Sequence, residues 1–273
     1  MKGLKSFRLK LKSLFFIFEN KMIYKAIVSD WNGTLFEDHT DKALNGKIIV
    51  SILFHVTGEI LKGKWEKTKE LKNTLKAVHK LYRTVKQYYK GERDLLDIYR
   101  IFDTDIVRGK PAPVIKSAMD KFAKEYAKRL DKRILEPLNE IKSDGKYISI
   151  LSASWKYGIE KTLENSGYSE LFDEIVANDM KICKGIISGF RIDIIYQKKY
   201  KTLEREFLKK RGFKEREILV LDDSEETFGE ILPPGNFIVP FFAPEDFKEK
   251  MASKYRAFVP ESETDLRKYL KSR

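Results

Sequence analysis

The sequence contains very little cysteine or histidine. Its one cysteine, Cys183, excludes a disulfide framework and a cysteine-rich metal site and is compatible with a reducing cytoplasm. The three histidines, His39, His55 and His79, are scattered and argue against a histidine-built zinc centre. We therefore expect a cytoplasmic protein without a zinc site of these kinds.

Acidic residues are fewer than basic residues. Against 54 Lys and Arg there are 41 Asp and Glu, which gives a formal net charge of +13 and favours phosphorylated metabolites, nucleic acid or an anionic membrane surface as partners. The excess lies mainly between residues 37 and 135, with 23 basic and 14 acidic residues. Zinc-finger spacing and a glycine–aromatic RNA-binding signature are both missing. A small phosphorylated substrate is therefore the expected partner, and nucleic acid a less favoured one.

Residues 1–21 form a basic N-terminal extension with a short apolar patch, Leu14–Phe18. The patch is too short to cross a bilayer and lacks a small-residue cleavage site, so we expect neither stable membrane insertion nor a signal peptide. Two interpretations stay open. The extension is an amphipathic surface anchor, or translation starts at Met22, directly before the first predicted strand.

The stretch Lys25–Phe36 organises the rest of the chain. Its apolar residues Ala26–Val28 predict a buried parallel strand, which is followed by Asp30 and a turn containing Gly33. A carboxylate after a central strand lies where open α/β sheets place their chemistry. An ordinary strand with an Asp-Asn-Gly turn is the simpler alternative.

Helical periodicity dominates residues 37–133, which we expect to form an inserted helical cap. One long helix is predicted by apolar residues at alternating four- and three-residue steps: Leu71, Leu75, Val78, Tyr82, Val85 and Tyr89. A second buried helix face is predicted after the prolines at 111 and 113 by Ile115, Met119, Phe122 and Tyr126. The segment Ile48–Val56 is apolar all round and predicts a buried helix. We expect the aromatic residues of these faces in the core, with a substrate-binding role as the alternative.

From residue 134 onward, predicted strands and helices alternate. Strands are expected over residues 146–152, 173–178 and 217–223, with candidate later strands at 237–242 and 257–260, and a hairpin over 180–193. Helices are expected over 134–144, the basic stretch 198–211, 244–254 and 264–271. This alternation predicts an α/β fold, a Rossmann-like, doubly wound, mostly parallel sheet with helices on both faces. The core would comprise residues 22–36 and 134–273.

Polar residues follow three of the predicted strands: Asp30, Ser152 and the pair Asp222–Asp223. Because parallel strands end at one edge of a sheet, we expect these side chains to meet there. Carboxylates brought together repel one another unless a hard cation lies between them, and Mg²⁺ is the natural choice. A hydroxyl, backbone N–H groups and a lysine could hold a phosphate. Asp30 would then attack phosphorus as a nucleophile and form an aspartyl-phosphate.

This ordered set of motifs resembles the haloacid dehalogenase superfamily over most of Met22–Arg273. The motifs are DWNGT at 30–34, ILSAS at 150–154, a lysine in QKKYK at 197–201, and VLDDSEET at 220–227. The stretch that begins with ILSAS, together with KGIISGF, is most similar to the phosphoserine-phosphatase-like branch, in which a helical cap lies between the first two motifs. The resemblance implies a Mg²⁺-dependent phosphoric monoester hydrolase that acts on a small phosphorylated metabolite.

The resemblance also implies a role for each matched acidic residue. Asp30 is the nucleophile and a metal ligand, and Asn32 contributes its backbone carbonyl to the metal. Asp223 is the acidic metal ligand of the fourth motif. Asp222 supports the metal directly or through its waters, with a turn or helix-capping role as the alternative.

The remaining matched residues are implied to bind the phosphoryl group. Ser152, the backbone amide of Ala153 and Thr34 belong to this set. Three lysines are candidates for the third motif: Lys199, which the helix register favours, Lys201 and Lys198.

The sequence departs from the family pattern at Asn32. Family phosphatases usually carry a second aspartate there, which protonates the leaving oxygen and then activates water. A carboxamide does neither, and general acid–base catalysis is typically worth 10²–10⁴-fold, so we expect a slow phosphatase. Two further functions stay open: a catalytically weak or inactive phospho-ligand-binding, regulatory protein, and a nucleic-acid end phosphatase.

Overall fold

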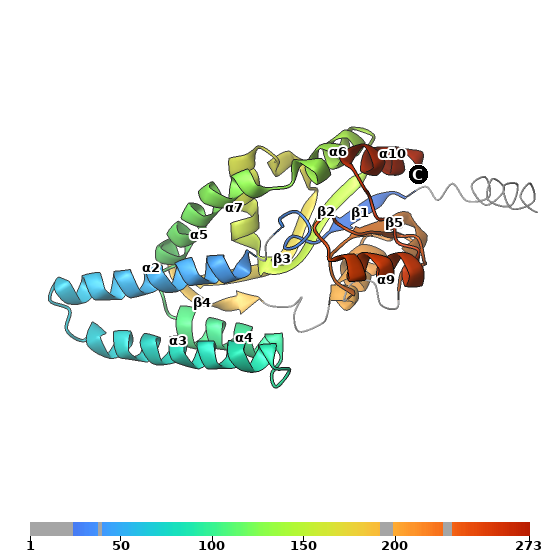
Figure 1. Ribbon diagram of the computed structural model, residues 1–273. Coiled ribbons are helices and arrows are strands. Elements are labelled where there is room, and N and C mark those ends of the chain that lie inside the picture. Colours follow the sequence, from blue (N-terminus) through green and yellow to red (C-terminus); the bar gives the residue numbers. More distant parts are fainter. Residues whose placement is uncertain (1–23, 38–39, 192–198, 226–230) are drawn as a thin grey trace, which may run out of the picture.

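The computed structural model describes residues 24–37, 40–191, 199–225 and 231–273. A six-stranded sheet runs through this part of the chain in the order β4-β3-β2-β1-β5-β6 (Figure 1). The strands are β1 (Ala26–Ser29), β2 (Tyr147–Trp155), β3 (Glu174–Cys183), β4 (Ile186–Arg191), β5 (Ile218–Leu221) and β6 (Phe237–Ile238). All neighbouring pairs are parallel except β3 and β4, which form an antiparallel hairpin. The mostly parallel, doubly wound sheet is therefore confirmed.

Strand β1 lies between β2 and β5, and all four of its residues are buried, as expected for an apolar run with a neighbour on each side. Its last residue, Ser29, pairs with Ile150 of β2 and with Leu221 of β5. Asp30, one residue further, is therefore level with Leu151 on one side and Asp222 on the other. The register of the sheet thus brings the first and fourth sequence motifs together.

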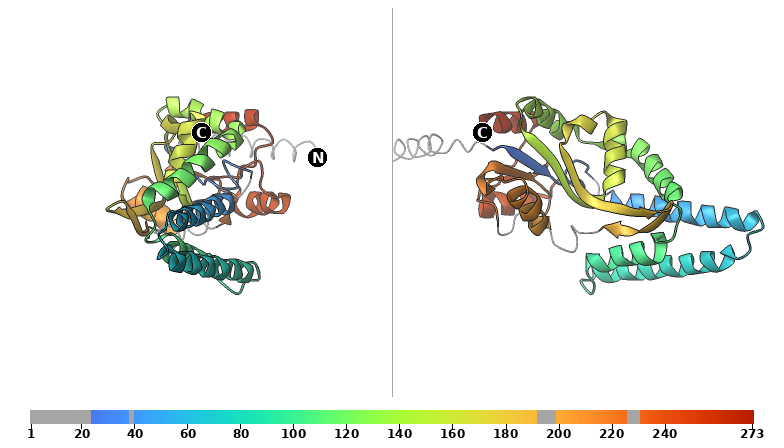
Figure 2. Two further views of the ribbon diagram at one scale, coloured as in Figure 1. Left: turned by 90° about the vertical axis from the view of Figure 1, so that its left-hand side faces the viewer. Right: turned by 180° about the vertical axis from the view of Figure 1, so that it is seen from behind.

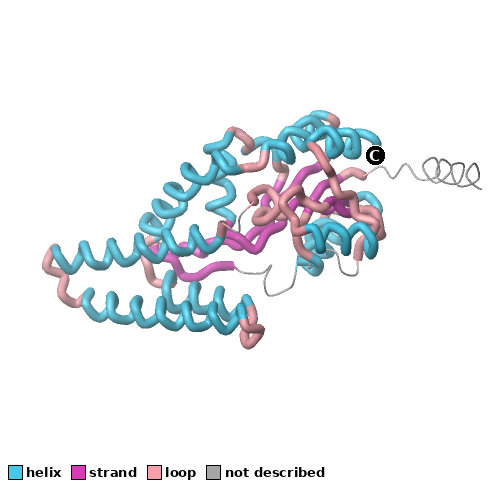
Figure 3. The backbone as a smooth tube through the Cα atoms, viewed as in Figure 1, coloured by secondary structure: helices cyan, strands magenta, loops and turns pink. Residues whose placement is uncertain are grey.

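Helices cover both faces of the sheet (Figure 3). They include α6 (Lys132–Ser143), α7 (Lys156–Ser166), α9 (Glu245–Tyr255), α10 (Glu263–Ser272) and the helical residues 199–209. Successive residues of β1 belong to different apolar clusters, Ile27 to one and Val28 to the other, because side chains alternate between the faces of a strand. Each face of the sheet therefore has its own core.

The segment between β1 and β2 is largely helical. It comprises α2 (Asp41–Leu61), α3 (Lys67–Tyr89), α4 (Leu95–Ile101), a π-helical segment (Phe102–Val107) and α5 (Ala112–Tyr126). Helices α2 and α3 form a long hairpin that projects beyond the sheet (Figure 2). The division of the chain into a core and a cap stays a prediction, and the extension of residues 1–21 lies outside the described residues.

Helix α2 differs from the buried helix predicted over Ile48–Val56. Ile48, Ile52 and Val56 are buried, but Phe54 is 77% exposed, because neighbouring helices cover only one side of α2. By length and composition alone, α2 is the one helix among the described residues that could cross a membrane. Its buried residues instead join the main core cluster of the fold.

Helix α3 packs through a different face from the one predicted. The predicted apolar row is only half-buried at Val78, and Tyr82 and Tyr89 are exposed. The buried positions of α3 are Thr74, Ala77 and Thr84. Small side chains allow close approach of neighbouring helices, so the contact is centred on them and the larger residues lie at its edge. The prediction that these aromatic residues belong to the core is wrong, whereas Ile115, Met119, Phe122 and Tyr126 of α5 are buried as predicted.

Some boundaries also differ from those predicted. Strand β2 continues through Trp155, beyond the predicted end at residue 152, and its pairing with β3 changes register between Ser152 and Trp155. The candidate strand at residues 257–260 is a single bridge between Phe258 and Ile238. A bridge of this kind requires only one pair of residues. A four-residue stretch of the sequence does not distinguish it from a full strand.

Candidate active site

Three carboxylates converge at the carboxyl edge of β1 and β5. The Asp30 N–H donates a hydrogen bond to the Leu221 carbonyl at 2.8 Å, which fixes the backbone as it leaves β1. Ligand oxygens of Asp30, Asp222 and Asp223 all lie within 4.8 Å of one another. The predicted convergence of the first and fourth motifs is therefore present in the structure.

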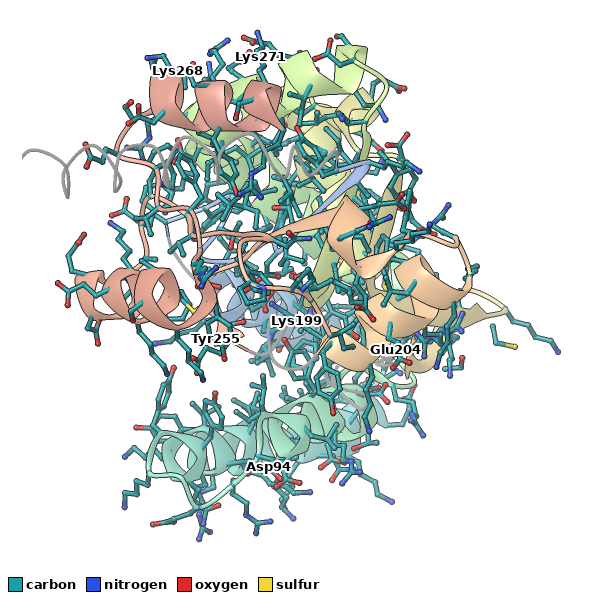
Figure 4. All side chains as sticks on the ribbon, turned by 90° about the vertical axis from the view of Figure 1, so that its right-hand side faces the viewer. Asp94, Lys199, Glu204, Tyr255, Lys268 and Lys271 are labelled. Carbon is teal, nitrogen blue, oxygen red and sulfur yellow. The ribbon has the colours of Figure 1, made fainter. Side chains whose placement is uncertain are left out.

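Lys199 is the lysine that reaches this cluster. Its Nζ lies 2.8 Å from Asp30 Oδ2 and 3.3 Å from Asp222 Oδ2, and the residue is only 8% exposed. Lys201 is exposed, and Lys198 lies outside the described residues. Figure 4 shows Lys199 on the core, on the side that faces the α3–α4 turn with Asp94. Of the two described candidates, only Lys199 is placed to neutralise the cluster.

Asp222 is held by the loop that follows β5. Its Oδ1 accepts hydrogen bonds from the backbone N–H and the hydroxyl of Ser224, both at 2.9 Å, while its Oδ2 faces Lys199. The side chain is therefore both a turn-forming residue and a member of the charged cluster. The turn-or-N-cap alternative and the metal-supporting role do not exclude each other here.

Gly33 makes room for the Asp223 carboxylate. Its φ is +69°, in the left-handed region that glycine adopts most easily. A Cβ built at this position would overlap the carboxylate of Asp223. The glycine of the first motif is thus required both by the turn and by the position of Asp223.

Replacing Gly33 with alanine is expected to displace Asp223 and to strain the turn, at a cost of about 1–2 kcal/mol for the backbone alone. We expect both the melting temperature and any metal-dependent activity to fall. Gly46→Ala in α2 is the matched control, because a Cβ there would meet nothing beyond the backbone of its own helix within 4 Å and the change favours a helix interior. Equal activity in the two variants would contradict the account of Gly33.

The cluster carries more negative charge than Lys199 can balance. Burial raises the pKa of Asp30 to about 6, with a smaller increase from Asp222, while Lys199 opposes the shift. Burial, Asp222 and Asp30 raise the pKa of Asp223 to about 7. Burial alone would lower the pKa of Lys199, but the nearby carboxylates outweigh it and raise that pKa. A further cation would relieve this repulsion.

The side chain of Asn32 is hydrogen-bonded to Thr40, the residue directly before α2. Its Oδ1 accepts hydrogen bonds from the Thr40 N–H at 3.1 Å and the Thr40 hydroxyl at 2.5 Å. Because a backbone N–H must donate, the oxygen of the amide faces Thr40, and the NH₂ group is the part left to donate elsewhere. Asn32 can therefore offer a hydrogen bond but cannot exchange a proton.

Of the predicted phosphate-binding residues, Ser152 and Ala153 lie on β2 at the same edge of the sheet, and Thr34 lies in the loop after β1. Ser152 is buried, and its Oγ accepts a hydrogen bond from the Ser154 N–H at 3.2 Å. Asn178 donates to the Ala153 carbonyl. Thr34 is buried with no hydrogen-bond partner for its hydroxyl among the described residues. Because Leu151 is level with Asp30, Ser152 lies one residue further along this edge.

A second polar group beside the site was not predicted from the sequence. Asp41, at the start of α2, accepts hydrogen bonds from Ser154 Oγ at 2.5 Å and from the Tyr99 hydroxyl at 3.2 Å. Burial, with the charges of Asp41 and Asp30, raises the pKa of Tyr99 well above its usual value. The pattern Thr-Asp before a helical stretch indicates a helix start, but nothing in the sequence pairs it with Ser154 and Tyr99.

The comparisons with known proteins agree with this arrangement. A family model described as haloacid dehalogenase-like hydrolase matches residues 27–217, which is more than half of the chain. The chain belongs to this family. The matched range includes the first two motifs and Lys199, and ends just before the carboxylates after β5.

Solved structures show the same fold at low sequence identity. A substrate-bound phosphoserine phosphatase complex is 16% identical, with 93% of this chain and 99% of that chain covered and a TM-score of 0.55. A phospho-aspartyl intermediate analogue of phosphoserine phosphatase is 17% identical, with coverages of 91% and 98% and a TM-score of 0.53. A protein of unknown function from Bordetella pertussis Tohama I is 11% identical, with coverages of 88% and 99% and a TM-score of 0.58. No curated protein matches the sequence.

Proposed function

We propose that this haloacid dehalogenase-like protein is a slow, Mg²⁺-dependent phosphomonoester hydrolase of the phosphoserine-phosphatase-like branch. Its substrate would be a small phosphorylated metabolite in the cytoplasm. The observation that carries the proposal is the buried Asp30 carboxylate, which lies 2.8 Å from Lys199 at the edge of the sheet where Asp222 and Asp223 converge. This arrangement supports Asp30 as the nucleophile and Lys199 as the cation that pairs with it.

The residues present fit a divalent cation. Three carboxylates face a single ammonium group, and burial, with a smaller contribution from the neighbouring carboxylates, raises the pKa values of Asp30 and Asp223. Hard carboxylate and carbonyl oxygens are the ligands that Mg²⁺ prefers. Asp30, Asp223 and the Asn32 backbone carbonyl would hold the ion, with Asp222 in support. When bound, Mg²⁺ would neutralise the cluster and polarise a phosphoryl oxygen.

The proposed reaction has two displacements at phosphorus. A carboxylate oxygen of Asp30 forms a bond to phosphorus as the bond to the alcohol oxygen breaks, and the released oxygen takes a proton from solvent. Water then attacks the phosphorus of the aspartyl-phosphate, releases inorganic phosphate and restores Asp30. Ser152 and the Ala153 amide would bind phosphoryl oxygens, and Lys199 keeps Asp30 ionised.

Asn32 limits both steps in this proposal. It donates a hydrogen bond without giving up or taking a proton, so the leaving group must depart with its charge and the attacking water is not activated. Hydrolysis of aryl and acyl phosphates, which have good leaving groups, would be slowed least. The same observation supports the second candidate function, a phospho-ligand-binding protein with little or no turnover.

Hydrolysis of p-nitrophenyl phosphate by the full chain, with Mg²⁺ and with EDTA, tests the proposal. We expect slow turnover that depends on Mg²⁺. Tight binding of phosphorylated ligands without turnover, even at high enzyme concentration, would overturn the phosphatase and favour the ligand-binding protein.

The carboxylate cluster also predicts how stability responds to pH and metal. The pKa values of Asp30 and Asp223, about 6 and about 7, lie above their unfolded value of about 4. The metal-free protein should therefore lose stability as pH rises from about 5 to 8, because the unfolded chain releases these protons first. Mg²⁺ binds the ionised carboxylates, so it should raise the melting temperature at about pH 8 and much less at about pH 5.

Thermal unfolding of wild type and Asp223→Asn at both pH values checks this prediction. The variant should show a smaller loss of stability between the two pH values and a smaller shift with Mg²⁺. A Mg²⁺ shift in wild type that is the same at both pH values would contradict it.

A further inference from the structure

The outer face of α3 carries a row of positive charge that the phosphatase site does not use. Lys72, Lys76, Lys80 and Arg83 follow at four- and three-residue steps, so they share one face of the helix. They line an open hollow of about 710 Å³. The hollow extends to Arg93 in the turn after α3.

Carboxylates neutralise only part of this row. Lys80 pairs with Asp105 at 2.8 Å, and Arg93 pairs with Asp97 at 3.6 Å. Within the described ranges, no carboxylate lies within ion-pair distance of Lys72, Lys76 or Arg83. The single glutamate of α3, Glu70, is engaged by Lys67 and Lys110 instead. Three cations of the row are therefore available to a ligand.

Exposed apolar and aromatic residues lie beside the row. Leu75, Tyr82 and Tyr89 recur every seven residues and are all more than half exposed, which places them between the buried face of α3 and the cations. The ammonium group of Lys86 lies over the Tyr82 ring, 4.8 Å from its centre. The face thus combines positive charge with accessible aromatic rings.

We propose that this face of α3 binds single-stranded nucleic acid. A row of cations along a helix matches a linear polyanion, and the neighbouring tyrosine rings offer surfaces on which bases can stack. A lipid bilayer is a poorer match, because an interfacial helix inserts a wide apolar side, whereas the exposed apolar residues of this face form only the single row Leu75, Tyr82 and Tyr89. In α3, Leu71, Val78 and Leu81 pack against the core instead. A small phosphorylated metabolite would engage only one or two of the cations.

The binding face and the proposed catalytic site are separate in this account. Within the part of the chain that the structure describes, no hydrogen bond or ion pair joins this face to Asp30, Asp222, Asp223 or Lys199, so Asp30→Asn should bind nucleic acid as wild type does. Failure of the phosphatase and failure of this proposal are therefore distinguishable.

Fluorescence anisotropy with a labelled single strand of about 15 nucleotides, a length within reach of such sites, tests the proposal on the full chain over a range of salt concentrations. The variant is Lys72→Gln/Lys76→Gln/Arg83→Gln. The matched control is Lys121→Gln/Lys124→Gln/Lys128→Gln, which removes the same charge from exposed lysines on and after α5. Losing three phosphate contacts should weaken binding roughly 100-fold at 0.1 M salt and reduce the salt slope by about 2. The control should stay within about threefold of wild type, because distant charges are screened.

Two further measurements assign the ligand. Tyr82→Ala should weaken oligonucleotide binding by several-fold through lost stacking and leave binding of inorganic polyphosphate unchanged. The proposal is overturned if wild type does not bind the oligonucleotide, or if both triple variants lose affinity equally. It is also overturned if polyphosphate or phosphatidylglycerol vesicles compete as well as the oligonucleotide does and Tyr82→Ala has no effect.

Discussion

Replacing Asn32 with aspartate is expected to raise the rate of phosphomonoester hydrolysis by roughly 10²–10⁴-fold, the usual worth of general acid–base catalysis. An aspartate can accept the same two hydrogen bonds from Thr40 that Asn32 accepts, so its position should be kept. It adds a carboxyl group that protonates the leaving oxygen and then activates water. The gain should be largest for alkyl phosphates, whose leaving groups most need a proton, and it is measured as kcat/KM on alkyl and aryl phosphates.

Asn45→Asp is the matched control for this gain. Asn45 also uses its side-chain oxygen as an acceptor, from Trp155 Nε1 at 2.8 Å, but it lies on α2 and is not part of the cluster of Asp30, Asp222 and Asp223. This variant should show wild-type turnover or less. The role given to residue 32 would be wrong if Asn32→Asp were no faster than wild type on any phosphomonoester while it remained folded.

Replacing Asp30 with asparagine is expected to reduce turnover by roughly 10⁴-fold or more, as loss of a nucleophile commonly does. The amide cannot form the aspartyl-phosphate, and Lys199 would keep Asp222 as its partner. Because the substitution removes one of three mutually repelling carboxylates, the metal-free variant should be as stable as wild type or more stable at about pH 8.

Measuring both turnover and thermal stability of Asp30→Asn separates loss of the chemical step from loss of folded structure. A stable Asp30→Asn variant that retains wild-type turnover would contradict the nucleophile assignment. The double variant Asp30→Asn/Asn32→Asp should also be inactive, since an acid–base group has no covalent step to assist without the nucleophile.

The centre of the site follows from features that a sequence records locally. The apolar residues 26–28 predict β1, and the apolar run before Asp222 predicts β5. Because the two strands pair in parallel, they bring Asp30 and Asp222 to one edge of the sheet. Lys199 precedes Leu203 by four residues, so the helix register places the two on the same face. Leu203 is buried, as this register requires, and Lys199 is therefore the favoured lysine. Local periodicity and strand geometry are sufficient for these positions.

Contacts between distant segments are less predictable. The bond between Asn32 and Thr40 and the pairing of Asp41 with Ser154 depend on how α2 enters the fold, for which no local pattern exists. On α3, small residues such as Thr74 and Ala77 form the contact, and hydrophobic periodicity gives weight to large side chains instead. The sequence therefore predicts the helix correctly and its orientation wrongly.

Rapid-mixing hydrolysis of p-nitrophenyl phosphate tests the central claim most directly. Since Asn32 cannot activate water, the aspartyl-phosphate should accumulate, and wild type with Mg²⁺ should release a burst of p-nitrophenol close to one equivalent per enzyme before slow turnover. Acid quenching during this phase should trap one phosphoryl group on the peptide that contains Asp30. Steady turnover with neither a burst nor a phosphorylated Asp30 peptide, retained in Asp30→Asn, would contradict the account.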